Sequence, residues 1–212
     1  DFTNVGQITI TITGKGNYVG TVNKTYYITK RKVTLTSEGG SKTYDSTPLT
    51  RPNVTVGGNG FVTDEVTSVQ AIGTVTEVKD SPVTNAIEYT VGTKFNINNY
   101  DISKNEGTLS ITEVDAEVTV TIKGHEETAT YDGNPHSVEG YEITDISNKL
   151  YTKDDVKFTG QANAEGTEAG TYQMHLTKDQ FSNKNSNFKN VTFVVEDGSL
   201  IINRKSIDDQ NR

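Results

Sequence analysis

The stretch SKTYDSTPLT at residues 41–50 returns later in the chain as TATYDGNPHS at residues 128–137. In each copy a Tyr-Asp pair is followed, after two further residues, by a proline. The residues of the pattern are Tyr44, Asp45 and Pro48 in the first copy and Tyr131, Asp132, Gly133 and Pro135 in the second. An Asp side chain can bond the backbone two residues on, and Gly suits a turn. We therefore interpret these residues as a structural turn signature, in which each Tyr packs for stability and takes no part in chemistry.

Two other markers recur in the same order along the chain. An acidic pair before Val occurs at residues 64–66 and 154–156, and a Gly-led strand occurs at residues 107–112 and 198–203. The three offsets between copies are 87, 90 and 91 residues. Such a fixed order with a small drift indicates two divergent copies of one domain, with short loop insertions in the second.

Each copy begins with a clearly alternating strand, KVTLTSE at residues 32–38 and EVTVTIK at residues 117–123. Several short β-like runs follow, separated by Gly-, Asn- and Asp-rich turns, which is typical of a sandwich or barrel. We expect an all-β chain of tandem immunoglobulin-like β-sandwich domains. The alternative is a β-grasp-like α+β domain, which needs a helix of about 10 residues in each copy. Only short helices are possible, around residues 145–150 or 178–183.

The markers also divide the chain into segments. The N-terminal segment holds two alternating strands around GKGNYVG, and two strands alone are marginal in water. It must therefore pack on the next domain, pair with another chain or hang loose. We expect C-terminal strands of a preceding repeat at 1–30, a first β domain at 31–115, a second at 116–206, and a tail or the start of a next domain at 207–212.

Composition excludes several classes of protein. The net charge is −8 and Lys and Arg are scattered, which disfavours nucleic acid and anionic membrane surfaces as partners. The chain has no Cys, so disulfides and thiolate sites are excluded. It has no apolar run of the roughly 18 residues that a membrane-spanning helix needs. We expect neither nucleic-acid binding nor membrane insertion.

A search for chemistry finds no convincing constellation. The three histidines, His125, His136 and His175, lack the spacing of a metal site. Adjacent carboxylates occur at 64–65, 154–155 and 208–209, and adjacent residues of a strand point to opposite faces. Calcium stays open as a weaker alternative, although the chain has no D-x-D-x-D-G loop. We therefore predict no enzyme, no catalytic residue, no metal ligand and no cofactor. An isopeptide bond from Lys32 or Lys123 also stays open, although both look like surface lysines.

Three stretches resemble a known family: KTYDSTPLT, NNYDISKNEGTLSIT and GKGNYVGTVNKTYYITK. They look like the MBG-type (YDG/YGX) repeat domains of bacterial cell-surface proteins and adhesins. This chain departs from that pattern at Ser46, where Gly is usual, and at Phe188, which we assign to the place of the closing Tyr. The resemblance implies tandem β domains in an extracellular stalk attached to the cell wall or surface, and it brings no catalytic residues.

From these observations we expect a non-catalytic repeat segment, a stalk or spacer, of an extracellular bacterial surface protein of the adhesin type. Its expected partners are neighbouring repeats of the same chain. The alternative is a binding module that itself recognises a host glycan, as mucin adhesins do, or a host protein. Most of the 10 Tyr and 7 Phe should be core residues. Of the neighbours Tyr26 and Tyr27, one should be buried and the other exposed.

Overall fold

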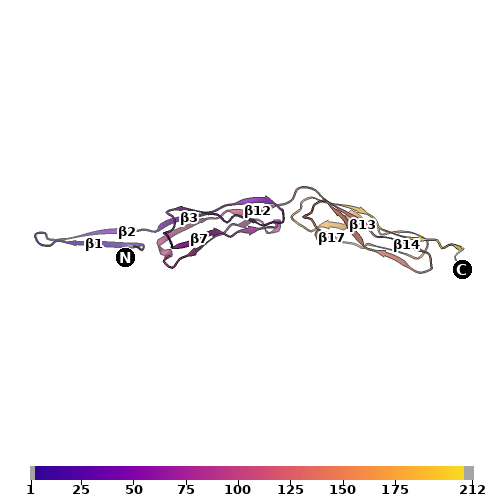
Figure 1. The fold of residues 1–212 in the computed structure, drawn as a ribbon, viewed down its shortest axis with the longest axis horizontal. Coiled ribbons are helices and arrows are strands. Elements are labelled where there is room, and N and C mark those ends of the chain that lie inside the picture. The colour runs from indigo at the N-terminus through magenta and orange to yellow at the C-terminus, as the bar shows by residue number, and fades with distance from the viewer. Residues whose placement is uncertain (1–2, 208–212) are drawn as a thin grey trace. The chain divides into compact units, whose positions relative to one another are not determined.

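The computed structural model describes residues 3–207, and their regular structure is almost entirely β (Figure 1). The helical segments in this range are 3-10 turns of three residues each: η1 (Val78–Asp80), η2 (Ile97–Asn99), η3 (Lys153–Asp155) and η4 (Lys178–Gln180). The all-β prediction is confirmed. The longer helix that the β-grasp alternative requires does not occur within residues 3–207, and around residues 145–150 the chain is mainly strand and turn.

The described residues fall into two compact units. The first comprises residues 3–42 and 47–111, and the second comprises residues 43–46 and 112–207. The second unit thus includes the first Tyr-Asp pair and the short segment after the strand at 108–112. Within that segment Val114 is only 9% exposed and forms a parallel bridge to Phe188, so it belongs to the core of the second unit.

In the first unit, two three-stranded sheets contain the opening and closing strands. The opening strand β3 (Arg31–Ser37) lies between β11 (Tyr100–Asn105), which is parallel to it, and β6 (Val54–Gly58), which is antiparallel. The closing strand β12 (Thr108–Thr112) lies between β4 (Gly40–Thr43) and β9 (Val83–Thr84). Apart from the N-terminal hairpin, two further pairs complete the unit: β7 (Val66–Ala71) with β10 (Ile87–Val91), and β5 (Leu49–Thr50) with β8 (Thr74–Val75).

The second unit repeats this pairing strand for strand. Its opening strand β13 (Val118–Gly124) lies between β21 (Val191–Glu196), parallel to it, and β16 (Tyr141–Ile146), antiparallel. Its closing strand β22 (Ser199–Asn203) lies between β14 (Glu126–Thr130) and β19 (Gly170–Gln173). The remaining pairs are β17 (Val156–Phe158) with β20 (Phe181–Asn183), and β15 (His136–Glu139) with β18 (Asn163–Gly166). The two units therefore share one topology, as expected of copies of one domain.

Alternating strands build both cores. In β3, Val33 and Leu35 are 1% and 0% exposed, and they pack with Ile87 and Tyr100. In β13, every second residue is buried, and the closing strand β22 adds Leu200 at 0% exposure. Each unit therefore buries apolar residues from its opening strand and its closing strand, which the period-two pattern of the sequence requires.

The register of the parallel strands corrects one assignment. Val33 lies opposite Ile102, and its counterpart Val120, which is equally far from the Tyr-Asp pair, lies opposite Phe193. Ile102 therefore corresponds to Phe193, and Tyr100, two residues earlier, corresponds to Val191. The assignment of Phe188 to the place of the closing Tyr is wrong, because Phe188 lies three residues before β21 in the loop that bridges to Val114.

The N-terminal hairpin pairs β1 (Gly6–Thr13) with β2 (Thr21–Ile28) around a turn at residues 14–20. Its base is joined to the rest of the first unit by hydrogen bonds, among them one from the backbone N–H of Val5 to Asn99 Oδ1 at 3.0 Å. Tyr26 and Tyr27 are 57% and 71% exposed, so the prediction that one of them is buried is wrong. Apolar and polar residues largely alternate along both strands, but no other part of residues 3–207 covers either face of the hairpin.

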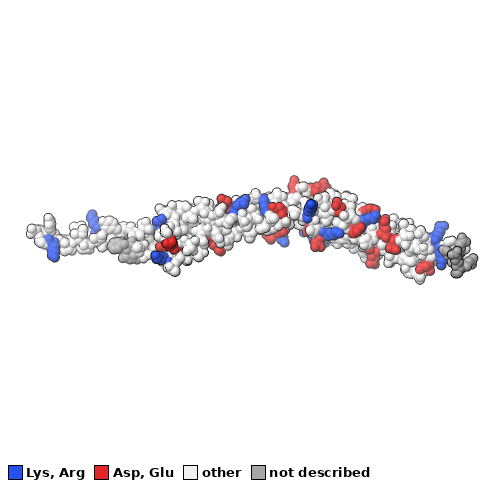
Figure 2. Space-filling view, viewed as in Figure 1, with Lys and Arg blue, Asp and Glu red and all other residues white. Residues whose placement is uncertain are grey.

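Charge is distributed unevenly along the chain. Residues 112–212 contain 18 acidic and 10 basic residues, whereas residues 1–111 contain 10 of each, so the net charge of −8 belongs to the C-terminal part. Figure 2 shows many acidic side chains on the visible face of the second unit. Within residues 3–207, the structure contains no helix that is long and apolar enough to cross a membrane.

Candidate functional site

The two Tyr-Asp turns have the same backbone position. Tyr44 directly follows β4, and Tyr131 directly follows β14. The N–H of Tyr44 donates to the carbonyl of Thr112 at 2.9 Å, and the N–H of Tyr131 donates to the carbonyl of Asn203 at 2.8 Å. Both acceptors are the last residue of a closing strand. Each Tyr thus extends the pairing of its strand with the closing strand by one hydrogen bond.

The residue after each Asp has the left-handed backbone conformation. Gly133 has φ of 81° and Ser46 has φ of 64°. An L-residue there brings its Cβ close to the following carbonyl, which costs about 1–2 kcal/mol, while Gly has no such penalty. The Gly of the second copy is therefore the residue that the turn favours, and Ser46 holds the same conformation at a cost.

The carboxylate of Asp132 is engaged within its own turn. Its Oδ1 accepts from the backbone N–H of Asn134 at 2.9 Å, as predicted for Asp in such a turn, and its Oδ2 accepts from Asn134 Nδ2 at 3.2 Å. His136 Nε2 lies 3.0 Å from Oδ1. The bonds from Asn134, followed by that from His136, lower the pKa of Asp132 to about 2. These contacts make Asp132 a structural acceptor and leave it poorly suited to take a proton from a substrate.

The prolines mark the end of each turn. Pro48 directly precedes β5 and Pro135 directly precedes β15, and both are exposed. A proline has no N–H to donate to a ladder, so the position before a short strand is one that it tolerates.

Both tyrosine rings are half-buried against the core of the second unit. The ring of Tyr44 meets Phe188 edge-on, with the centroids 5.8 Å apart. Phe188 in turn packs edge-on against Tyr151, with the centroids 5.2 Å apart. Tyr44 is therefore part of an aromatic cluster, in which edge-to-face contacts stabilise the packing.

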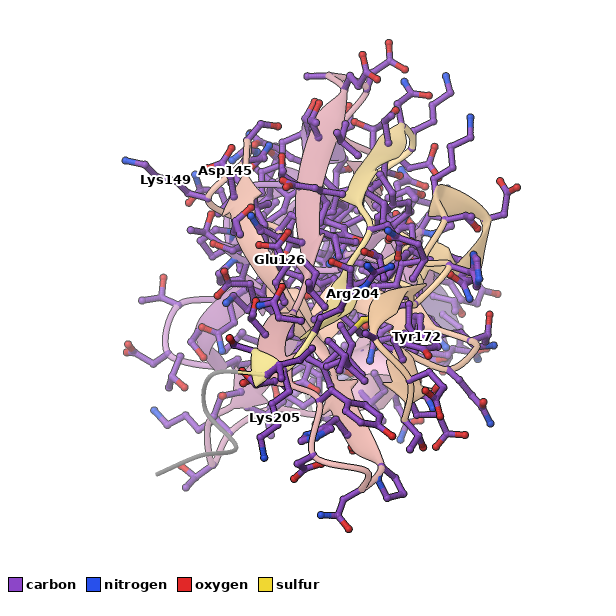
Figure 3. The ribbon with its side chains drawn as sticks, turned by 90° about the vertical axis from the view of Figure 1, so that its right-hand side faces the viewer. Glu126, Asp145, Lys149, Tyr172, Arg204 and Lys205 are labelled. Carbon is purple, nitrogen blue, oxygen red and sulfur yellow. The ribbon has the colours of Figure 1, made fainter. Side chains whose placement is uncertain are left out.

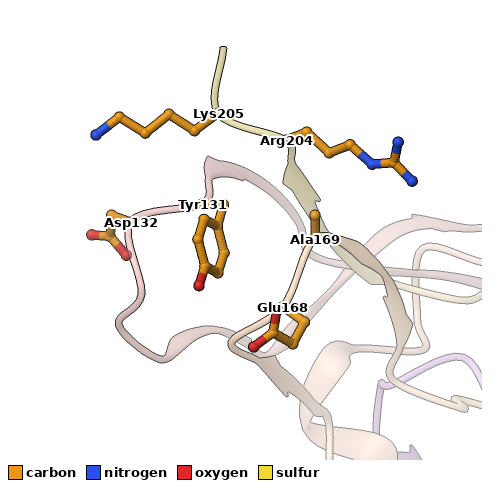
Figure 4. Close-up of a pocket in the computed structure, with 6 residues that line it drawn as sticks. All are labelled: Tyr131, Asp132, Glu168, Ala169, Arg204 and Lys205. Atoms are coloured by element: carbon orange, nitrogen blue, oxygen red, sulfur yellow. The ribbon is translucent and has the colours of Figure 1, made fainter. Parts of the chain in front are cut away.

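Tyr131 instead lines an open hollow with a volume of about 520 Å³. Its other lining residues are Asp132, Glu168, Ala169, Arg204 and Lys205. In Figure 4 the ring of Tyr131 lies between Asp132 on one side and Glu168 with Ala169 on the other. Figure 3 labels Arg204 and Lys205, which follow β22, and Tyr172 on the neighbouring strand β19.

The hollow offers an aromatic face and charged groups of both signs. The hydroxyl of Tyr172 donates to the carbonyl of Glu168 at 3.0 Å, which fixes the loop beside it. An aromatic ring flanked by hydrogen-bonding groups suits a sugar or a peptide side chain. The lining residues supply a phenol hydroxyl and two carboxylates but no imidazole. They therefore do not form the set of nucleophile, base and orienting group that acyl-transfer catalysis uses.

The other candidate groups lie apart from this hollow and from one another. His125 Nδ1 is 2.7 Å from the carbonyl of Glu139, and His175 is exposed after β19. Glu65 accepts from the hydroxyl of Tyr100 at 2.6 Å, and Asp155 accepts from the N–H of Thr152 at 2.7 Å.

Nowhere in residues 3–207 do three or more His, Asp or Glu side chains gather to hold a metal ion. Asp208 and Asp209 lie outside the described residues. Lys123 pairs with Glu196 at 3.2 Å on the surface, and Lys32 is exposed. Neither lysine has the buried setting that an isopeptide bond requires.

Sequence reasoning identified Tyr131 and Asp132 but missed the rest of the hollow. Glu168 and Ala169 come from the loop before β19, and Arg204 and Lys205 follow β22, so only the pairing of β22 with β14 and β19 brings them together. The one sequence signal for the hollow was the dipeptide Arg204-Lys205 directly after the closing strand, because the Tyr-Asp turn bonds to the end of that strand.

Comparison of the chain with family models, with curated proteins and with solved structures finds no match.

Proposed function

We propose that this chain is a non-catalytic repeat segment, a stalk or spacer, of an extracellular bacterial surface protein of the adhesin type. The observation that carries the proposal is the identical strand pairing of the two units around the same Tyr-Asp turn. Copies of one small β domain in tandem are the usual way to build length from a modest core.

The finer fold that we propose for each unit is an immunoglobulin-like β-sandwich of the MBG type. The support is that the opening and closing strands lie in different three-stranded sheets, and that both contribute fully buried side chains. Leu35 and Leu109 do so in the first unit, and Ile122 and Leu200 in the second, all at 0% exposure. Two sheets that face each other across such residues are the basis of a sandwich.

A spacer role also agrees with how the polar groups are used. The Asp132 carboxylate is bonded inside its own turn. Asn85, at 0% exposure, accepts from Gly73 N–H at 3.0 Å and donates to the carbonyls of Glu38 at 2.9 Å and Arg51 at 2.8 Å. Such groups stabilise a scaffold, because a buried amide with its bonds satisfied specifies one arrangement of the loops.

The cellular part of the proposal is tested by antibody labelling of intact cells that produce the protein. Antibodies raised against this chain should label unbroken cells, and external protease should remove the signal while a cytoplasmic protein stays intact. Labelling that occurs only after lysis would place the protein inside the cell and contradict the proposal.

The second candidate is a binding module for a host glycan or protein, and the hollow beside Tyr131 is the observation that favours it. The hollow is open, has a volume of about 520 Å³ and combines an aromatic ring with charged side chains. We rank it second because the Tyr-Asp turn that forms one wall also serves the fold in the first copy, where the ring of Tyr44 packs against Phe188.

A further inference from the structure

In the N-terminal hairpin, β1 and β2 pair in the same register as β19 and the closing strand β22 of the second unit. In the hairpin, Gly6 lies opposite Ile28 and Ile8 lies opposite Tyr26. In β19 and β22, the corresponding pairs are Gly170 with Ile202 and Tyr172 with Leu200. The strand β2 also leads directly into the opening strand β3. By position and register, β2 is a closing strand and β1 is its antiparallel neighbour.

One strand of the usual sheet is missing from this hairpin. The closing strands β12 and β22 are both central, flanked by β9 or β19 on one edge and by β4 or β14 on the other. Among the strands of residues 3–207, β2 pairs with β1 alone. The absent neighbour is the counterpart of β4 and β14, the strands that end in a Tyr-Asp turn.

The face that such a sheet would bury is mostly apolar and is uncovered. The side chains of Ile8, Ile10, Ile12, Val22, Tyr26 and Ile28 share one face of the hairpin with Lys24, which lies opposite Ile10. Tyr26 is 57% exposed, while its counterparts Leu109 and Leu200 are 0% exposed. The opposite face is polar, with hydrogen bonds such as that from Thr11 to Asn23 at 2.8 Å. An apolar face backed by a polar one indicates a surface that packs on a partner.

We propose that the free edge of β2 binds a β-strand that runs parallel to it and ends in a Tyr-Asp turn, supplied by a neighbouring repeat. In the second unit, Glu126–Thr130 lie opposite Ser199–Asn203 in a parallel register. The same register places the incoming strand opposite residues 25–29. The N–H of the incoming Tyr then donates to the carbonyl of Thr29, as the N–H of Tyr131 donates to that of Asn203 at 2.8 Å.

The base of the hairpin and its charge suit this partner. A hollow of about 210 Å³ lies there, and Ile28, Thr29 and Tyr100 are among its lining residues. Thr29, whose carbonyl the incoming Tyr would bond, is one of these lining residues. Residues 3–30 contain three Lys and no acidic residue, whereas β14 contains two Glu. Opposite charges on neighbouring strands favour pairing.

The proposal rests on the repeat architecture of the proposed function, but it is tested on the purified protein. Residues 126–134 are fused through a short Gly-Ser linker ahead of the full chain. A parallel partner of β2 ends at the base of the hairpin, where the chain also begins, so a short linker suffices. The linker gives the added strand an effective concentration in the millimolar range.

The readout is amide hydrogen exchange in β2, compared with two matched fusions. One carries the same nine residues in scrambled order, and the other carries Tyr131→Ala in the added segment only. The native segment should slow exchange of the β2 amides that face away from β1 by at least about tenfold. The Tyr131→Ala fusion keeps the backbone N–H and lacks only the ring, so it should lose part of that protection, and the scrambled fusion should give none.

Equal exchange in the native and scrambled fusions would overturn the proposal. Protection that depends on protein concentration, with a dimer seen by light scattering, would also overturn it, because a second copy would then be the occupant. Either failure leaves the surface location untouched, since antibody labelling of cells tests that separately.

Discussion

The left-handed turn residue of the second copy allows a quantitative test of the view that the Tyr-Asp pattern is structural. Gly133 has φ of 81°, and a Cβ added there meets no atom within 4 Å. Replacing Gly133 with Ala therefore adds no clash and introduces only the left-handed penalty of about 1–2 kcal/mol. Ala also restricts the unfolded chain, which returns about 0.4–1 kcal/mol. We expect Gly133→Ala to lower the free energy of unfolding by about 1 kcal/mol.

Equilibrium urea denaturation of purified variants measures this change, and the reverse substitution is the complement. Ser46→Gly removes the penalty at φ of 64° and should raise the free energy of unfolding by up to about 1 kcal/mol. Gly6→Ala is the matched control, because its Cβ would be 4.0 Å from the nearest atom, and it should stay within about 0.5 kcal/mol of the parent. The reasoning would be refuted if Gly133→Ala left the free energy of unfolding unchanged or raised it, or if Ser46→Gly lowered it.

Three further outcomes follow from burial and charge. Leu200→Ala should cost about 2–5 kcal/mol in urea denaturation, while Tyr26→Ala at the corresponding hairpin position should cost under about 1 kcal/mol, since Leu200 is 0% and Tyr26 57% exposed. Asp132 has a pKa of about 2, below its usual 3.8, so its stabilising contribution should be present above pH 3.8 and lost as the pH falls through 2, which carboxyl NMR can follow. Burial raises the pKa of Tyr151 to about 12, so its contribution should be present below pH 10 and lost as the pH rises through 12, which ultraviolet titration can detect.

The sequence allowed prediction of the strands that carry an apolar alternation. The opening strands β3 and β13 and the closing strands β12 and β22 were all located to within one residue at each end. Their pattern survives because one face of each strand packs into a core. The recurring markers also led to the repeat, which the shared pairing of the two units now displays in three dimensions.

Strands with polar composition could not be found in this way. The strands β4 and β14 read GSKT and EETAT, and their burial shows no apolar period. They lie at the edge of their sheets, where pairing with the closing strand determines their conformation. The strand β11, YDISKN, is hidden for a similar reason, because its parallel pairing with β3 connects residues about 70 positions apart.

The candidate site was predictable only where its chemistry is local. The bond from Asn134 N–H to Asp132 and the suitability of Gly133 for the turn follow from neighbouring residues, and both were anticipated. The hollow around Tyr131 is formed by residues from strands that are distant in the chain, so no local sequence pattern predicts it. The exposure of both Tyr26 and Tyr27 shows the same limit, because alternation predicts which face is apolar and cannot supply the partner that covers it.

The central claim is that this chain spaces or presents other parts of a surface protein and does not itself bind a ligand. A binding array tests this claim most directly. The purified chain and its Tyr131→Ala variant are applied to immobilised host glycans, mucins and matrix proteins. The account predicts no saturable binding by either protein. Reproducible binding with an affinity of about 1 μM, lost on Tyr131→Ala while the variant stays folded, would contradict it.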